Sequence, residues 1–438
     1  MDLSQFATIR IAAADLNGLM RGKRVPSSYA DKLSSGSLRM PLSALNVDIW
    51  GADIENSPLV FESGDADGIL VATDRGAVPM PWLENDSALV PMTMLNEDRT
   101  PFLGDPRQAL ASVLERYEAR GWNVFAATEM EFMLVDDSGE TLKPPRDPRS
   151  GRRIFALDVL SLDELDAFDA FFTELHQGCI DMGLPVQSII NESGLGQFEV
   201  TLSHQAALRA ADDALLFKLL VRGIARKHGM AATFMAKPYL DDAGNGMHVH
   251  FSVVDQDGSN VFDNGGPEGT ETLLSAVAGC VAAMPASTLI FAPNGPSYNR
   301  LVPGAHAPTG ACWAYENRTA AIRIPGGPYD ARRIEHRVAG GDINPYLMFA
   351  AVMGAAIEGI EEGLKPDAPI TGNAYEHDVP QLAPDWAAAI DRFENDPFIA
   401  RCLPQMLIRN LVLTKRQELA KLADLPDNDH WKLYLERV

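Results

Sequence analysis

The residues best suited to chemistry are charged and imidazole side chains spaced two positions apart, which places them on one face of an extended strand. Glu129 and Glu131 have this spacing in TEMEF, and His248 and His250 have it in GNGMHVHFS. One such pair alone is most often a solvated face of a sheet. Several pairs on one shared sheet would instead form a polar cup, in which the carboxylates require cations.

A third segment, NESGLGQFEVTLS, extends this pattern. Gln197 and Glu199 share a face, Glu192 lies beyond a glycine turn, and Glu335 supplies a fifth glutamate. Oxygen ligands with one imidazole favour Mg²⁺ or Mn²⁺ over zinc, which takes more cysteine and histidine. Metals of this kind bind phosphate oxygens, so the glutamates indicate phosphoryl transfer from ATP.

Residues 294–345 hold six arginines in a chain that is acidic elsewhere. Within this stretch Arg333, Glu335 and Arg337 alternate with other residues, so an extended strand would present all three on one face. Guanidinium groups beside a carboxylate suit bidentate binding of carboxylates and phosphates. A solvated face laced with surface ion pairs is the alternative for such a strand.

Composition argues against several classes of partner and compartment. Asp and Glu number 60 against 37 Lys and Arg, a formal net charge of -23, and such a polyanion repels nucleic acid and anionic membranes. The four cysteines have no paired spacing, which argues against a zinc knuckle or a disulfide framework. The first residues lack the basic start and apolar run of a signal peptide. We therefore expect a cytoplasmic protein with no nucleic acid and no membrane partner.

The chain is predicted to form two domains. Residues 1–104 are rich in strand and turn signals, including a hairpin with its turn at Asn17-Gly18. Asp105 and Pro106 then open a helix as N-cap and first-turn proline, so the second domain is predicted to span 105–438.

The second domain is predicted to be α+β, because its strands cluster in polar-faced groups and do not alternate regularly with helices. Residues 273–293 carry no charge and reach the length of a membrane span, but Pro285 interrupts a segment rich in small residues. We expect a buried helix with a break there, not a span. Further helices are predicted at 162–182, 206–228, 342–364, 385–395 and 408–423.

These segments together resemble the glutamine synthetase family, collinearly and over nearly the whole chain. The resemblance implies a small N-terminal β-grasp-like domain over 1–104. It implies a catalytic domain of the ATP-guanido kinase-like/glutamine synthetase type over 105–438, with a curved antiparallel sheet flanked by helices. Self-association into stacked rings, a dodecamer with sites between neighbouring subunits, is also implied. The motifs that carry the resemblance are DLNGLMRGKRVP, TEMEF, ESGLGQFE, ATFMAKP, GNGMHVHFS, PSYNRLVPG, ENRTAAIRIP, RRIEHR and NPYLMFAA.

The resemblance also assigns roles to individual residues. It implies two or more Mg²⁺ or Mn²⁺ ions, one on Glu131, Glu192 and Glu199 and another on Glu129, His248 and Glu335. Arg300, Arg318 and Arg337 fall where the family binds the glutamate carboxylate and the phosphoryl group, and Gly244 falls on the glutamate-binding loop. The positions that match the ATP-binding side are His250, Ser252, Arg323 and Arg333.

Two departures from the family pattern concern the amine side. Where glutamine synthetases carry a glutamate in Y-E-A-P, this chain has Ala305-His306-Ala307-Pro308. The N-terminal F-D-G-S-S pattern is replaced by MPLSALNVDIWG, with Asp48 the nearest aspartate. An anionic box helps to capture and deprotonate ammonium, and a neutral imidazole does not replace it.

The sequence thus favours a γ-glutamylamide ligase, as in the γ-glutamylpolyamine and γ-glutamylmonoamine synthetases. ATP would phosphorylate L-glutamate, and an organic amine, a polyamine or a monoamine, would displace phosphate. His306, with an ordinary pKa near 6.5, would accept a proton from the amine or act only as a loop residue. Two alternatives remain: a true glutamine synthetase that uses ammonium, and a non-catalytic structural or regulatory relative.

Overall fold

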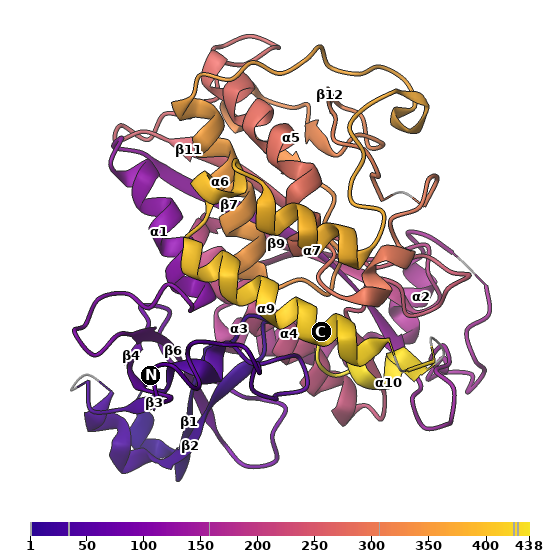
Figure 1. The fold of residues 1–438 in the computed structure, drawn as a ribbon. Coiled ribbons are helices and arrows are strands. Elements are labelled where there is room, and N and C mark those ends of the chain that lie inside the picture. The colour runs from indigo at the N-terminus through magenta and orange to yellow at the C-terminus, as the bar shows by residue number, and fades with distance from the viewer. Residues whose placement is uncertain (1, 34–35, 157, 306, 424, 427–428) are drawn as a thin grey trace.

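A computed structural model describes residues 2–438 except residues 34–35, 157, 306, 424 and 427–428. Two sheets and a set of helices make up the molecule (Figure 1). The N-terminal sheet lies at one end, and the larger sheet runs through the middle of the molecule behind the C-terminal helices.

The N-terminal sheet begins with the predicted hairpin. Strands β1 (Thr8–Ala14) and β2 (Met20–Pro26) pair antiparallel, and Gly18 in the turn adopts a φ of 77°, which favours glycine. Sheet order is β2-β1-β6-β4-β3, with β5 paired to β6. The hairpin is confirmed. The remaining strands are β3 (Arg39–Pro41), β4 (Asp67–Ala72), β5 (Val78–Pro79) and β6 (Ala88–Leu95).

The larger sheet carries the motifs that the sequence singled out. Its order is β12-β13-β14-β11-β7-β9-β8, with β10 paired to β7. Strand β7 (Asn123–Val135) lies at its centre, between β11 (Met247–Val254) and β9 (Gln197–Ala206). The other strands are β8 (Val186–Asn191), β10 (Ala231–Thr233), β12 (Trp313–Tyr315), β13 (Ile322–Ile324) and β14 (Ile334–His336).

One pairing departs from the expected antiparallel sheet. Strands β12 and β13 run parallel, with Trp313 opposite Ile322. A parallel connection normally needs a long crossover. Here the chain turns back within residues 316–321, where Glu316 has a φ of 49° and its amide donates to the Ile324 carbonyl at 3.1 Å. The sheet is therefore mixed, and the fully antiparallel expectation is wrong at this edge.

Most predicted helices are present. Helix α1 (Pro106–Glu118) is capped by the Asp105 side chain as expected, since its carboxylate accepts the Arg107 amide. The helix expected over 162–182 is two helices that meet at Phe168, whose ring is buried against Phe198 at 5.6 Å between centroids. Apart from α5, the other α-helices are α2 (Leu162–Ala167), α3 (Asp169–Met182), α4 (Ala207–Lys227), α6 (Pro345–Glu361), α7 (Trp386–Asn395), α8 (Ile399–Cys402), α9 (Gln405–Leu422) and α10 (His430–Tyr434).

The predicted break in the apolar helix is wrong. Helix α5 (Glu271–Phe291) continues through Pro285. An interior proline costs about 3 kcal/mol, but α5 packs along α6 so closely that a Cβ on Gly279 would lie 2.1 Å from the Ala355 carbonyl oxygen. This packing outweighs the proline. Helix α5 is the one described helix long and apolar enough to span a membrane, and 72% of its most apolar window is buried inside the molecule.

Helices cover one face of the larger sheet and leave the other polar. Along β7, Met130 and Phe132 are buried, and the Phe132 ring packs edge-on against Phe217 of α4 at 6.4 Å. The alternate residues of β7 point to the opposite face, and from Phe125 to Glu131 they are only partly buried. The two-residue period of the strand therefore separates the apolar core from a polar face on which a site can be built.

Candidate active site

The polar face of the larger sheet brings the sequence motifs into register. His248 on β11 lies directly opposite Glu129 on β7, and Glu199 on β9 lies opposite Glu131. Strand β14 adds Glu335, which lies opposite His250. The E-x-E, Q-x-E and H-x-H segments thus share one face of one sheet, as the sequence predicts. We call the carboxylates and imidazoles of this face the cup: Glu129, Glu131, Glu192, Glu199, His248, His250 and Glu335.

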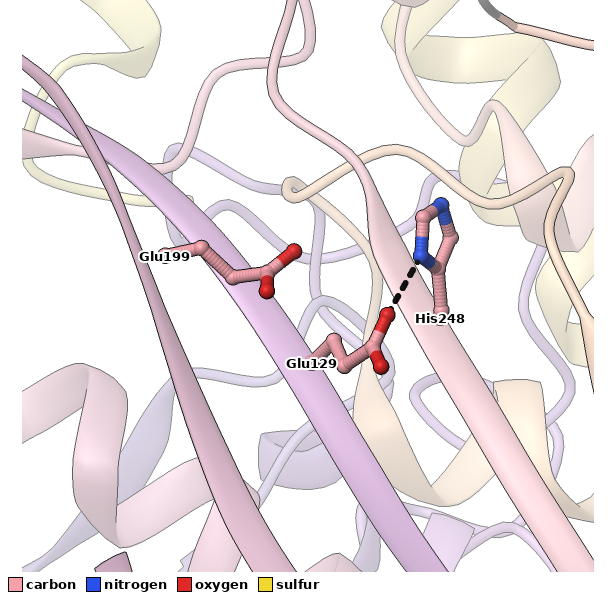
Figure 2. A group of neighbouring side chains, drawn as sticks. All are labelled: Glu129, Glu199 and His248. Carbon is pink, nitrogen blue, oxygen red and sulfur yellow. Dashed lines mark hydrogen bonds and ion pairs between the residues drawn. The ribbon is translucent and has the colours of Figure 1, made fainter. Parts of the chain in front are cut away.

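Glu129 is the centre of the cup. Its Oε2 lies 2.9 Å from His248 Nδ1, and its Oε1 lies 3.0 Å from His250 Nε2. Figure 2 shows Glu199 extending toward the same space from the neighbouring strand. Burial raises the pKa of Glu129, but its contacts with the two imidazoles outweigh burial and hold that pKa well below its ordinary value.

The other carboxylates of the cup are crowded by like charge. Burial, followed by the charges of Glu129, Glu131 and Glu192, raises the pKa of Glu199 to about 9. Burial and the charge of Glu131 raise the pKa of Glu192 to about 7. Carboxylates directly opposite one another on a sheet destabilise it. The carboxylates of the cup therefore cannot all be ionised at neutral pH unless cations offset their charge.

Glu335 is buried, with 1% of its surface exposed, and it is paired with arginines. Arg323 Nη1 donates to Glu335 Oε2 at 2.7 Å, and Arg337 Nη1 donates to Oε1. Burial raises the pKa of Glu335, but the charges of His250 and Arg337 outweigh burial and lower it. This part of the cup is charge-balanced, in contrast to the part around Glu199.

The donor set fits divalent cations. Among the residues that the structure describes, two groups of His, Asp, Glu or Cys have ligand atoms within 4.8 Å of one another: Glu129, Glu199 and His248, and Glu129, His250 and Glu335. Several carboxylate oxygens and few imidazoles suit a hard cation such as Mg²⁺ or Mn²⁺. Such cations neutralise the negative charge of buried carboxylates that lie close together.

These groups divide the residues differently from the two predicted sets. The prediction pairs His248 with Glu335 and leaves His250 to the nucleotide, whereas His250 lies against Glu129 and opposite Glu335. The register explains the difference. His248 and His250 lie on the same strand face, so each imidazole reaches one carboxylate oxygen of Glu129. The assignment of individual ligands to individual ions stays a prediction.

Three of the four residues predicted to bind glutamate, Gly244, Arg300 and Arg337, lie at one end of the cup. Arg300 is 5% exposed, and its Nη1 donates to the Val338 carbonyl at 2.8 Å. Gly244 lies against it: a Cβ there would be 2.4 Å from the Ala236 carbonyl oxygen and 3.0 Å from Arg300 Cγ. Only glycine fits between them. Arg337, also buried, joins this end through its ion pair with Glu335.

The residues predicted to bind ATP line a large cavity at the other end. This cavity of about 1120 Å³ is lined by Glu129, His250, Ser252 and Arg333 among others. Arg333 Nε donates to His250 Nδ1 at 3.3 Å, which joins the cavity to the cup. Its volume is ample for a nucleotide. Arg323, also assigned to ATP, is not among the residues that line this cavity. It is paired with Glu335 and donates to Glu316 at 3.2 Å.

The structure does not place two of the predicted site residues, Arg318 and His306, in the cup. Arg318 is exposed between β12 and β13, although its charge lowers the pKa of Glu192 against the larger effect of burial. His306 lies outside the described residues. The loop that contains it, residues 301–309, begins directly after Arg300.

Two buried amides, Gln197 and Asn245, tie the cup to the glutamate end, and the sequence predicted only the strand face of Gln197. The Gln197 side-chain nitrogen lies 3.3 Å from Glu131 Oε2, 2.9 Å from the Gly244 carbonyl and 3.0 Å from Asn245 Oδ1. Asn245 in turn donates to the Met235 carbonyl at 2.9 Å. The Q-x-E spacing puts Gln197 on the correct strand face, but no sequence signal indicates these partners.

Comparison with known proteins agrees with this geometry. Residues 103–434 match the family described as "Glutamine synthetase, catalytic domain". The chain is 35% identical over 428 residues to gamma-glutamylputrescine synthetase PuuA of Escherichia coli, covering 95% of this chain and 89% of that protein. It is 31% identical to glutamate--isopropylamine ligase of a Pseudomonas species, covering 98% and 95%. A solved structure of GmaS with ADP superposes with a TM-score of 0.84 at 27% identity, covering 98% and 97%.

Proposed function

This chain belongs to the glutamine synthetase family, and we propose that it is an ATP-dependent ligase that joins L-glutamate to an organic amine through γ-glutamyl phosphate. The observation that carries the proposal is the cup: carboxylates, two imidazoles and three arginines converge on one sheet face beside a nucleotide-sized cavity. Two relatives that the chain resembles over most of its length are named for γ-glutamyl transfer to amines, one to putrescine and one to isopropylamine.

The reaction divides between the two ends of the cup. Arg300, Arg318 and Arg337 hold the glutamate carboxylate and the phosphoryl group, and the Gly244 loop closes the glutamate side. His250, Ser252, Arg323 and Arg333 lie along the nucleotide phosphates. Two or more Mg²⁺ or Mn²⁺ ions held by the glutamates and His248 would neutralise phosphate charge during transfer.

Two displacement steps follow from this arrangement. In the first, a γ-carboxylate oxygen of glutamate attacks the terminal phosphorus of ATP, and ADP leaves. In the second, the amine nitrogen attacks the γ-carbonyl carbon, phosphate leaves with the bonding electrons, and the nitrogen loses a proton. We assign His306 as the acceptor of that proton, because it stands where the family pattern has a glutamate.

The amine side supports an organic amine over ammonium. The residues that replace Y-E-A-P, Ala305 to Pro308, carry no carboxylate. A compact cation such as ammonium depends on an anionic box, whereas a larger amine gains binding energy from apolar contact along its carbon chain.

Assembly and location extend the proposal. We assign residues 1–104 to a β-grasp-like domain and 105–438 to the catalytic domain of a ring-forming, dodecameric, cytoplasmic enzyme.

The test is phosphate release from ATP with glutamate, Mg²⁺ and a panel of amines that includes ammonium, a monoamine, an amino alcohol and a diamine. We expect saturable turnover and γ-glutamyl amide formation with at least one organic amine. Turnover with ammonium alone would instead identify a glutamine synthetase. Absence of ATP binding in calorimetry with Mg²⁺ would identify a non-catalytic relative.

A further inference from the structure

Arg300, an arginine of the predicted glutamate site, is held at both ends by one short segment of the chain. Its Nη1 donates to the Val338 carbonyl at 2.8 Å. Its backbone amide donates to the Ser297 carbonyl at 3.1 Å, and the Ser297 hydroxyl donates to Asp342 Oδ2. Val338 and Asp342 belong to residues 338–344, between β14 and α6, which we call the anchor segment. The place of Arg300 is therefore set from the anchor segment.

Asp342 is the charged group of the anchor segment, and it is 5% exposed. Its Oδ2 accepts the Asn294 side-chain amide at 2.9 Å as well as the Ser297 hydroxyl. The Asn294 backbone amide in turn donates to Ser297 Oγ at 3.1 Å. Asn294 is the N-cap of the short 3₁₀ helix Gly295–Asn299, and Arg300 is its C-cap. One buried carboxylate thus fixes the start of the helix that ends at Arg300, through hydrogen bonds that its charge strengthens.

The charge of Asp342 also acts on Arg300 directly. Burial lowers the pKa of Arg300, and the charges of Glu131 and Asp342 oppose that shift. Burial raises the pKa of Asp342, and its two side-chain hydrogen bonds and the charge of Lys218 oppose that rise. Asp342 therefore supports the ionised form of the arginine that it also holds in place.

Lys218 of α4 fixes the backbone on which Asp342 stands. Its Nζ donates to the Gly341 carbonyl at 2.9 Å and to the Ile343 carbonyl at 3.2 Å, on either side of Asp342. Lys218 is buried, and its Nζ lies 5.0 Å from the centre of the Phe234 ring. A buried ammonium that left these carbonyls would lose its hydrogen bonds with no water to replace them. The anchor segment is thus a fixed support.

The anchor segment also contacts the other part of the predicted glutamate site. The Gly341 amide donates to the Asn245 carbonyl at 2.8 Å, and Asn245 directly follows Gly244. A Cβ on Gly341 would lie 2.7 Å from the Phe234 carbonyl oxygen, so the segment packs closely there. Arg300 and the Gly244 loop are therefore placed against the same segment. A shift of Arg300 alone would change the distance between the two.

We propose that Asp342 is a positioning residue that holds Arg300 at the distance from the Gly244 loop that L-glutamate requires. The inference rests on the proposed function, because it takes Arg300 as a glutamate ligand. A ligand-binding group is effective only when neighbouring contacts fix its geometry, and Asp342 supplies such a contact through Ser297. Its loss should weaken the binding of glutamate and leave the binding of ATP unchanged.

The experiment compares Ser297→Ala with Ser287→Ala in the full-length enzyme. Ser297→Ala removes the hydroxyl that joins Asp342 to the 3₁₀ helix and alters no charge. Ser287→Ala is the matched control, because it makes the same change at a buried hydroxyl of α5 that has no hydrogen-bond partner among the described residues. The KM values of glutamate and ATP are measured with the best acceptor of the panel, ammonium included.

We expect the KM of glutamate to rise roughly threefold to tenfold in Ser297→Ala, as for the loss of one hydrogen bond, with the KM of ATP unchanged. Asp342→Asn also removes the charge, so its effect on the KM of glutamate should be larger. Because both changes act on one network, the double variant should show less than the product of the two single effects.

A wild-type KM of glutamate in Ser297→Ala would overturn the inference. Equal rises for glutamate and ATP, or the same rise in Ser287→Ala, would overturn it as well, since either would indicate a general loss of structure. If the wild-type enzyme consumes no ATP with glutamate and any acceptor, the proposed function fails instead. The two failures are distinguishable, because the first is seen only among variants of an active enzyme.

Discussion

The cup and the loop of residues 301–309, which we call the acceptor loop, are built by opposite means. Apart from Glu192, which follows β8, the side chains of the cup lie on four adjacent strands, and the cross-strand register fixes which residues face one another. The described residues of the acceptor loop form no helix or strand, its Val302 is 43% exposed, and the Tyr375 hydroxyl donates to the Ala307 carbonyl. In the proposed function, chemistry that needs sub-ångström placement lies on strands, whereas the choice of amine lies on a loop.

This contrast explains how one fold serves several amines. In the proposed reaction the cup and its arginines perform phosphoryl transfer to glutamate, a step that is the same whatever the acceptor. The acceptor loop would face the second step, in which the amine differs. A change at the loop should therefore alter which amine is used, and a change in the cup should abolish the reaction with every amine.

The largest expected effect comes from the centre of the cup. Glu129→Gln keeps the shape of the side chain but removes the charge that belongs to both candidate metal groups. We expect kcat/KM to fall roughly 1000-fold or more with every acceptor, since metal charge is worth several kcal/mol in phosphoryl transfer. Steady-state kinetics over a Mg²⁺ titration checks this, with the exposed Glu62→Gln as control. A fall in kcat/KM with one amine only would contradict the division of roles between the cup and the acceptor loop.

Gln197 tests whether the cup and the glutamate end act as a unit. Gln197→Leu removes the amide that lies between Glu131 and the Gly244 carbonyl. We expect the KM of glutamate to rise roughly 10- to 100-fold, the range for residues that orient metal ligands, with a smaller change in the KM of ATP. Gln177→Leu, on the exposed side of α3, is the control. Equal changes for glutamate and ATP would contradict a positioning role.

His306 tests the loop itself. His306→Glu restores a carboxylate where the family pattern has one, so we expect kcat/KM for ammonium to rise about tenfold relative to the organic amine. Competition between ammonium and the amine at fixed concentrations measures the ratio, and His306→Gln separates charge from shape. If ammonium use does not rise at all, the account of the acceptor loop is wrong.

The smallest expected effect is on stability alone and concerns Glu164, which lies beside the cup. Burial and the charge of Asp158 raise the pKa of Glu164 to about 7, and its Oε1 is buried without a partner. Because the folded state disfavours the ionised form, Glu164 stabilises the fold at low pH, and this contribution is lost as pH rises through about 7.

Glu164→Gln stays neutral, so the variant should gain stability over the wild type as pH rises from 5 to 8. We expect roughly 1–3 °C in Tm at pH 8 by scanning fluorimetry, with little change in activity. Asp163→Asn, an exposed neighbour, serves as control. A Tm difference that does not vary with pH would show that the carboxyl of Glu164 does not titrate in this range.

Local sequence signals predicted the parts of the fold that depend on local physics. The Asn17-Gly18 turn and the Asp105 cap act over a few residues, and both appear as expected. The two-residue spacing also predicted which side chains share the polar face. The break at Pro285 was wrong because tertiary packing of α5 on α6 outweighs the cost of proline, and that packing has no local signature.

The sequence predicted which strand residues share the polar face but not how they pair. Glu129 and His250 were named from spacing and family resemblance, yet their contact follows from the register of β7 and β11. Gln197 donates to the Gly244 carbonyl and Tyr375 to the Ala307 carbonyl, and both partners are far away in the sequence. Such contacts depend on how strands and loops meet in space, which spacing along one segment does not encode.

The most direct test is a competition in one vessel, with glutamate, ATP, Mg²⁺ and equal concentrations of isotopically labelled ammonium and an organic amine from the panel. Mass spectrometry of the products gives the ratio of γ-glutamyl amide to glutamine. We predict that the organic amide predominates for at least one amine. Glutamine as the sole product with every amine would contradict the proposal that this enzyme has exchanged ammonium for a larger acceptor.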